Sequence, residues 1–261
     1  MIPDVRAVVD GRPAGGADVA LALAARAGHF TALQVRGRAA RGLDLHLARL
    51  TGATAELYGE RLDPALVLNC LDLVLGDDLR DASVRLHVVL TDTLHVLAVT
   101  GAPVEPATGP LALRSVPFQR FLPHIKHGGG FPQAHLARRA AAEGFDEVLL
   151  TAGDGVIAEG GITNLGALSG GTVVWPEAPM LHGVTMALLE RALEAAGVPQ
   201  ERRVMKAADL AGFDAVFVAN SHGVAPAGRI DDVRLATGHP SMGRLRALFD
   251  AVPWDPIRRG V

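Results

Sequence analysis

The sequence predicts an α+β fold built from two lobes. Segments with the two-residue period of strands alternate with segments of helical period, and no regular βαβ repeat is present. A Gly- and Pro-rich stretch at residues 101–110 divides the chain. We therefore expect a small first domain at residues 1–105 and a larger second domain at residues 106–261.

The first domain is expected to begin with strands and continue with helices. Turn residues and apolar alternation predict a strand pair around Asp10-Gly11, a second pair within residues 30–42, and a hairpin of residues 83–90 and 94–100 across Thr91-Asp92. Apolar residues at helical spacing predict one helix behind an Asp44 N-cap and another over residues 64–75.

The second domain mixes both element types. Its expected strands are 111–116, the two arms of a hairpin within 146–160, 171–176 and 214–220. Its expected helices are 133–144, 186–197, the region around 205–212, and 239–250.

Composition favours a cytoplasmic enzyme or binding protein. The 261 residues carry a net charge of −3 without a basic run, which gives little support to nucleic-acid or membrane-surface binding. The N-terminus is a poor signal peptide, and the apolar stretches are too short for a membrane helix. The single cysteine, Cys70, excludes an internal disulfide and is interpreted as a buried structural thiol.

Lys126 is one of only two lysines in a chain that otherwise carries its positive charge on arginine. A buried lysine can lose its proton and become a nucleophile, whereas an arginine cannot. The residue therefore suggests chemistry, although a lysine can also survive by chance in a biased composition.

Three other features support the chemical interpretation, and each has a plainer alternative. Glu159 lies in a Gly-rich, apolar stretch where a carboxylate needs a cationic partner or a protonated acceptor, unless it is a solvated strand end. Arg49 lies on a predicted helix, where a salt-bridged surface role is common. Residues 182–185 (HGVT) open a helix whose amides favour phosphate, as the start of any helix does. Together with Lys126 they supply the amine, carboxylate, cation and helix start that pyridoxal phosphate needs.

The order and spacing of these segments resemble the fold-type IV pyridoxal-phosphate enzymes, the class IV aminotransferase family. This family includes branched-chain and D-amino-acid aminotransferases and aminodeoxychorismate lyase. The similar segments extend from FTALQV at residue 30 to GRID at residue 228, and Glu159 follows Lys126 by 33 residues. The resemblance implies a small N-terminal α/β domain, a larger C-terminal domain that carries the cofactor lysine, a homodimer, and an amino acid and a keto acid as substrates.

The resemblance also implies roles for individual residues. Lys126 matches the lysine that bonds to pyridoxal phosphate as an aldimine, and Glu159 matches the glutamate on its ring nitrogen. Arg49 matches the phosphate-binding arginine. The remaining matches are Val184 and Thr185 at the phosphate-binding helix start, Asn164 after the glutamate, and Asn220 and Ser221 in the last phosphate-side loop.

Several positions depart from the family pattern on the substrate side. Phe131 stands where the aminotransferases usually have a tyrosine, and Gln34 ends a segment that has lost both charges of the usual F-E-x-x-R pattern. A loop with an R-G-x-G pattern is shortened to the hairpin near Thr91. The Lys126-His127 pair resembles that of the deoxychorismate lyases. Met186 stands where arginine is common. The substrate-side candidates are His29, Gln34, His124, His127 and Phe131, with His182 and His222 nearby.

The leading hypothesis is a pyridoxal-phosphate-dependent aminotransferase. Two alternatives stay open: a lyase of the deoxychorismate type that releases pyruvate, and a pyridoxal-phosphate-binding homologue with little turnover. No His, Cys or Asp spacing predicts a metal site. The glycines at 128–130 are expected to let the backbone approach the cofactor closely.

Overall fold

The computed structural model describes residues 5–257 and contains two compact units. The first unit comprises the chain up to Val104, the segment Ile125–Gly129, and the chain from Pro253 onward. The second comprises Glu105–His124 and Gly130–Val252. The first break lies one residue from the expected boundary. The lysine segment differs from the expectation, because its backbone pairs with a strand of the first unit and therefore belongs to that unit.

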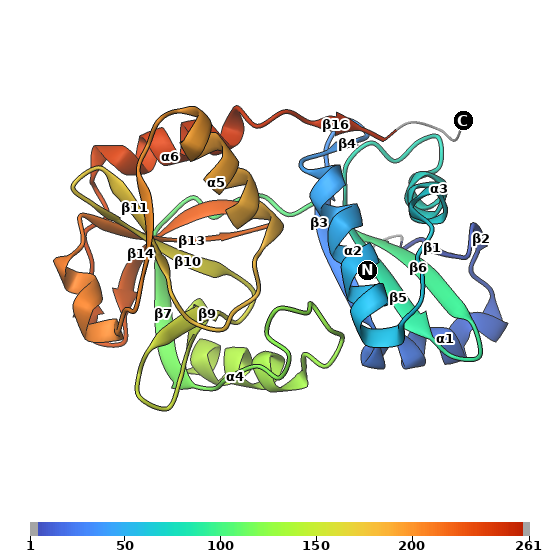
Figure 1. The fold of residues 1–261 in the computed structure, drawn as a ribbon, viewed down its shortest axis with the longest axis horizontal. Helices are drawn as coiled ribbons and strands as arrows, with labels where there is room; N and C mark the ends of the chain where they lie inside the picture. The colour runs from blue at the N-terminus through green and yellow to red at the C-terminus, as the bar shows by residue number, and fades with distance from the viewer. Residues whose placement is uncertain (1–4, 258–261) are drawn as a thin grey trace. The chain divides into compact units, whose positions relative to one another are not determined.

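Within the described residues, the first unit is built on a five-stranded antiparallel sheet of order β2-β1-β6-β5-β3 (Figure 1). The strands are β1 (Ala7–Val9), β2 (Arg12–Pro13), β3 (His29–Val35), β5 (Ala82–Leu90) and β6 (Leu94–Gly101). The helices are α1 (Val19–Ala24), α2 (Leu43–Tyr58) and α3 (Pro64–Leu75), with the 3-10 turns η1 (Gly16–Asp18) and η2 (Ala25–Ala27). A separate ribbon pairs β4 (Ala39–Ala40) with β16 (Asp255–Pro256).

The core of the first unit forms where α2 and α3 cover the sheet. Leu50 from α2 and Leu71 from α3 pack with Val84 and Leu86 from β5. Cys70 lies in this core without exposed area, as expected for a structural thiol. Its sulfur accepts the Gly11 N–H at 3.2 Å, and burial raises the pKa of the thiol.

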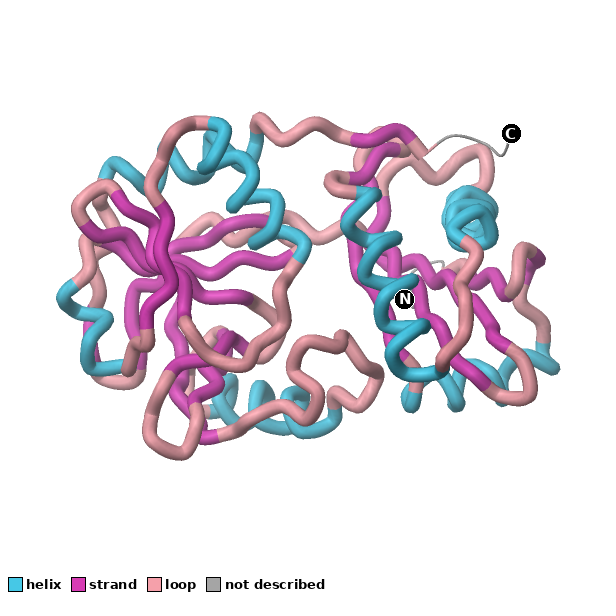
Figure 2. The backbone as a smooth tube through the Cα atoms, in the orientation of Figure 1, coloured by secondary structure: helices cyan, strands magenta, loops and turns pink. Residues whose placement is uncertain are grey.

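In the part of the chain that is described, the second unit holds a nine-stranded mixed sheet (magenta in Figure 2). Its main path is β12-β11-β10-β13-β14-β7-β8-β9, and β15 pairs with β14. The β14–β7, β7–β8 and β11–β12 pairs are parallel, and the others antiparallel. The strands are β7 (Leu111–Pro117), β8 (Glu147–Thr151), β9 (Ile157–Gly160), β10 (Asn164–Ser169), β11 (Thr172–Pro176), β12 (Gln200–Arg203), β13 (Ala215–Asn220), β14 (Gly223–Ile230) and β15 (Val233–Arg234).

Helices cover the central strands of this sheet. α4 (Phe131–Ala142) packs on β7 and β8, whereas α5 (Val184–Ala195) and α6 (Pro240–Asp250) pack against each other and on β13 and β14 (Figure 1). A 3-10 segment, η3 (Ala207–Gly212), follows β12. Every residue of β8 is buried, as expected for a strand covered on both faces.

Most predicted elements are confirmed, and the differences have local causes. Residues 64–75 form α3 with the expected bounds. The helix expected behind Asp44 instead begins at Leu43 after Gly42, whose φ of +67° suits glycine, so Asp44 lies in the first turn. The expected helix near 205–212 is the 3-10 segment η3. The strand pair expected within residues 30–42 is limited to one antiparallel bridge between Arg36 and Ala39, and β3 pairs along its length with β5.

Candidate functional site

Lys126 lies on a short extended segment that pairs with the start of β3. The Phe30 N–H donates to the Lys126 carbonyl at 2.8 Å, and the Gly128 N–H donates to the Gly28 carbonyl at 2.7 Å. Ile125 is buried beside it. These two hydrogen bonds, which do not involve the lysine side chain, hold the main chain at Lys126 in place.

Gly128 is required by close packing within the first unit. A Cβ at this position would lie 2.6 Å from the Ala25 carbonyl oxygen and 2.7 Å from that of Arg26. The sequence predicted that the glycine run lets the backbone approach the cofactor. The structure shows a close approach of Gly128 to the backbone of η2, and the approach to the cofactor stays a prediction.

The Lys126 amine lies over an aromatic ring. Its Nζ is 4.9 Å from the centroid of Phe30, which stacks on His87 at 5.1 Å. The nearby His46 on α2 shares a 2.6 Å hydrogen bond with the Thr31 hydroxyl through Nδ1. Burial lowers the pKa of His46 to about 3, with the charges of Arg49 and Lys126 adding to the effect. The imidazole is therefore neutral beside the lysine segment.

Arg49 follows His46 by one helical turn on α2. Because Gly42 has no side chain with which to cap this helix, the cap comes from a distant part of the chain. Asp255 Oδ2 accepts the Leu43 N–H at 2.9 Å, across a sequence separation of 212 residues. The helix that carries Arg49 is thus held by the C-terminal segment of the first unit.

Glu159 is buried on β9 of the second unit, 5% exposed. Arg120 Nη1 donates to its Oε1 at 3.1 Å, and the Leu181 N–H donates to Oε2 at 3.3 Å. The sequence indicated a cationic partner or a protonated acceptor for this carboxylate but did not identify Arg120. The only sequence signal was an arginine in the loop between β7 and Lys126, which resembles any surface arginine.

Asn164 holds the chain that leads into α5. Its Nδ2 donates to the Leu181 carbonyl at 2.7 Å, and its Oδ1 accepts the Gly183 N–H at 3.1 Å. Glu159 on β9 and Asn164 on β10, two strands that follow one another in the chain, therefore both bond to the segment that leads into α5. The sequence placed Asn164 among the cofactor-binding residues, and the structure shows how its side chain shapes the start of α5.

The first turn of α5 is tied to the end of β13. Val184 and Thr185 are buried, and the Thr185 hydroxyl donates to the Asn220 carbonyl at 2.7 Å. The Asn220 side chain in turn accepts the His222 N–H at 2.8 Å. Ser221 lies in the half-buried turn between them. The structure thus brings the four predicted phosphate-side residues of the second unit together.

Two substrate-side candidates are occupied by structural contacts in the first unit. His29 has no exposed area, and its Nε2 shares a 3.0 Å hydrogen bond with Thr54 on α2. Gln34 accepts the Val104 N–H at 2.9 Å and donates to the Ser83 hydroxyl at 3.1 Å. These contacts give both residues a structural role, and their substrate-side role stays a prediction.

The other candidates are more exposed. His124 is exposed, and His127 is half-buried, with its Nδ1 accepting the Gly129 N–H at 3.3 Å. Phe131 begins α4 with 65% of its area exposed, and its ring stacks on that of His135. His182 contacts Glu190 at 2.5 Å on the surface. The substrate-side role of His124, His127 and Phe131 stays a prediction.

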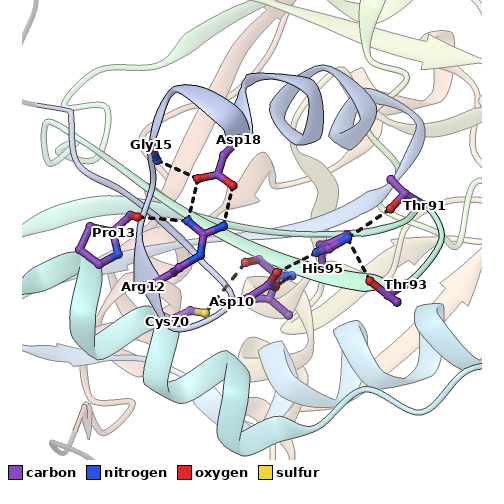
Figure 3. A network of polar contacts seen from close by, with 10 residues as sticks. Asp10, Arg12, Pro13, Gly15, Asp18, Cys70, Thr91, Thr93 and His95 are labelled. Carbon is purple, nitrogen blue, oxygen red and sulfur yellow. Dashed lines mark hydrogen bonds and ion pairs between the residues drawn. The ribbon is translucent and has the colours of Figure 1, made fainter.

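A polar network closes the hairpin that stands in place of the R-G-x-G loop (Figure 3). Asp10 Oδ2 contacts His95 Nδ1 at 2.7 Å, and Asp10 Oδ1 accepts the Val96 N–H at 2.8 Å. The hydroxyls of Thr91 and Thr93 each lie 3.2 Å from His95 Nε2. These contacts fix the β5–β6 hairpin to the β1–β2 turn, and they were not foreseen.

The residues present fit pyridoxal phosphate. In the described chain, no side chain caps the α5 start at Gly183, which leaves that helix terminus suited to a phosphate. The buried Thr163 hydroxyl, four residues after Glu159, has no hydrogen-bond partner among the described residues. A buried carboxylate, a lysine amine and an arginine complete the required donor set.

Residues 5–257 contain neither a candidate membrane-spanning helix nor a candidate metal-binding group. No helix there has the length and apolarity to cross a membrane. No group of three His, Cys, Asp or Glu side chains in that range could hold a metal ion.

Comparison with known families identifies the class of protein. The family described as "Amino-transferase class IV" matches residues 28–230, which is most of the chain. The protein therefore belongs to the class IV amino-transferase family, whose enzymes use pyridoxal phosphate. No curated protein matches the sequence.

Solved structures share the fold at low sequence identity. A hypothetical aminotransferase from Mycobacterium tuberculosis in its PLP-bound form has a TM-score of 0.80 and 21% identity, covering 95% of this chain and 98% of its own. A fold IV-transaminase from Curtobacterium pusillum has a TM-score of 0.79 and 19% identity, covering 94% and 99%. A candidate 4-amino-4-deoxychorismate lyase from Legionella pneumophila has a TM-score of 0.81 and 19% identity, covering 92% and 96%. At these identities the similarity establishes the fold.

Proposed function

We propose that the protein is a pyridoxal-phosphate-dependent aminotransferase that acts on an amino acid and a keto acid. The observation that carries the proposal is the buried Glu159, held by Arg120 and Leu181 next to the uncapped start of α5. A buried carboxylate of this kind is suited to a protonated ring nitrogen. Family membership supports the same reaction class.

Each residue then has a defined task. Pyridoxal phosphate, when bound, supplies an electron sink for the α-carbon of the substrate. Lys126 would hold it covalently and, when released, move a proton at its Nζ. Glu159 would accept a hydrogen bond from the ring nitrogen. Arg49 and the α5 start would hold the phosphate.

The remaining predicted residues support this assembly. Val184 and Thr185 supply the helix start, which Asn164 shapes and Asn220 secures; Ser221 completes the turn. His124, His127 and Phe131 are proposed to face the substrate. A homodimer and a cytoplasmic location are further parts of the proposal, and light scattering of the purified protein tests the first.

The chain offers an unusually clean test of the lysine, because Lys206 is its only other lysine. We expect the purified protein with pyridoxal phosphate to show a visible absorption band, and borohydride reduction to leave a cofactor-sized mass on the peptide that contains Lys126. Lys126→Ala should lose both signals, while Lys206→Ala keeps them. A band that survives in Lys126→Ala would refute the assignment.

The reaction is tested by a screen of amino donors. Appearance of the amino group on an added keto acid, followed by mass spectrometry, supports an aminotransferase. A lyase is the second candidate, favoured by the Lys126-His127 pair, and would release pyruvate without an acceptor. A band that no donor alters would indicate a cofactor-binding homologue with little turnover.

A further inference from the structure

We propose that Arg120 is a positioning residue that holds Glu159 in the orientation and charge state needed at the cofactor ring. The inference rests on the proposed function and adds a residue to it. Arg120 lies in the loop between β7 and Lys126, and its guanidinium bonds to Glu159.

Arg120 and Glu159 form a buried ion pair. Only 7% of each side chain is exposed, and Nη1 of Arg120 lies 3.1 Å from Oε1 of Glu159. The same nitrogen donates to the Pro123 carbonyl at 2.9 Å. Arg120 therefore joins Glu159 to the stretch of chain that ends three residues before Lys126. A lysine could supply the charge but not the planar set of donors.

The two oxygens of Glu159 are held by different parts of the second unit. Arg120 holds Oε1, and the Leu181 N–H holds Oε2. With both donors present the carboxylate has one orientation and a compensating positive charge. Removing the guanidinium would leave a buried carboxylate without that charge, and such a group takes up a proton or turns toward water. In either state it is a poorer acceptor for a ring nitrogen.

A second ion pair, which is largely buried, provides a matched control. Arg38 and Asp72 pair in the first unit with 15% of each side chain exposed, and Arg38 also bonds to the Gly76 carbonyl. Loss of either arginine removes one member of a pair that is largely shielded from solvent. Only the Arg120 pair includes a residue assigned to the cofactor.

The experiment compares Arg120→Met, Arg120→Lys, Glu159→Gln and Arg38→Met with the wild type. Three readouts are measured: the unfolding temperature of the cofactor-free protein, the dissociation constant for pyridoxal phosphate, and the pH dependence of the bound absorption spectrum. We expect Arg120→Met to weaken cofactor binding at least ~10-fold, the scale of one charge-assisted hydrogen bond. Its spectrum should change with pH as that of Glu159→Gln does, and Arg120→Lys should lie between it and the wild type.

Arg38→Met is expected to lower the unfolding temperature and leave the spectrum unchanged. The inference is overturned if Arg120→Met, or Arg120→Lys where the Met variant fails to fold, keeps the wild-type spectrum and affinity while Glu159→Gln alters both. If the wild type itself binds no pyridoxal phosphate, the proposed function fails, and this inference fails with it. Cofactor binding by the wild type therefore distinguishes failure of the proposed function from failure of the Arg120 inference alone.

Discussion

The Asn164 side chain accepts the Gly183 N–H at 3.1 Å and fills the space that a side chain on Gly183 would need. A Cβ there would lie 2.1 Å from Asn164 Oδ1. We predict that Gly183→Ala displaces the start of α5 and weakens the binding of pyridoxal phosphate at least ~10-fold, because helix-start amides lose their orientation. Titration of the cofactor by absorbance measures the effect.

Gly243→Ala is the control for this substitution. Gly243 lies exposed in α6, and a Cβ there would meet nothing within 4 Å. Alanine is favoured over glycine in a helix interior by about 0.5–1 kcal/mol, so this variant should be as stable as the wild type or more stable. Unchanged cofactor affinity in Gly183→Ala would contradict the assigned role of the segment.

Gly128→Ala tests how the lysine segment is placed. The added methyl group would meet the carbonyl oxygens of Ala25 and Arg26 at 2.6 and 2.7 Å. Since both contacts are to backbone, the segment must move. We therefore expect the variant to lose the covalently held cofactor even though Lys126 itself is unchanged. Gly130→Ala, two residues on, meets nothing within 4 Å at a φ of −82° and should behave as the wild type. Equal borohydride labelling of Lys126 in both variants would argue against this account.

Sequence periodicity was sufficient to predict a helix or strand where local and tertiary preferences agree. The α3 helix has Asp63 as its N-cap and Pro64 at its first turn, and both signals are local. The strands β10, β12 and β14 were not expected, because their identity depends on pairing in the large sheet. The four-residue β12, for example, is polar and largely exposed, and it is a strand only through its parallel pairing with β11.

The chemistry-bearing residues were predictable by type, and their partners were not. A buried glutamate requires a cation, but no short-range pattern distinguishes Arg120 from the other arginines. The lysine segment was expected in the second domain because it follows the linker in sequence. Its membership of the first unit depends on hydrogen bonds to Gly28 and Phe30, almost 100 residues earlier.

Glu147 is expected to make stability fall as pH rises. Burial raises its pKa to about 7, although the Val148, Ile162 and Gly161 amides oppose the shift. A carboxyl group with a folded pKa above its unfolded value stabilises the protein fully below pH of about 4.5, and this contribution is lost as pH rises through about 7. The loss is of order 3 kcal/mol.

Glu147→Gln should flatten this part of the profile. Urea unfolding at a series of pH values from 5 to 8 measures it, with Glu194→Gln on the exposed side of α5 as the control. A Glu147→Gln profile that falls as steeply as the wild type would show that another group titrates in this range.

His29 is expected to make folding stability fall at acid pH. Burial lowers its pKa to about 4, so the folded state holds it neutral. Its contribution to stability is present above the unfolded value of about 6.5 and is lost as pH falls through about 4. We predict that His29→Gln, which can still bond to Thr54, reduces the acid-side loss by about 3 kcal/mol, the equivalent of this shift. The exposed His135→Gln should leave the loss unchanged, and an identical loss in both variants would exclude His29 as its source.

Asp255 is expected to stabilise the helix that carries Arg49. Its carboxylate accepts the Leu43 N–H at the start of α2, where Gly42 offers no side chain. Asp255→Ala should cost about 1 kcal/mol and reduce hydrogen-exchange protection in the first turn of α2. Asp255→Asn keeps an acceptor and should lose less.

Asp63→Ala provides the comparison, since Asp63 caps α3 from within its own segment by accepting the Ala65 N–H at 2.9 Å. Both variants remove one cap, so their stabilities should fall by similar amounts, but the protection should be lost in different helices. Only Asp255→Ala should also weaken cofactor binding, because Arg49 lies on α2. If the α2 peptides of Asp255→Ala exchange at the wild-type rate, the C-terminal segment does not hold this helix.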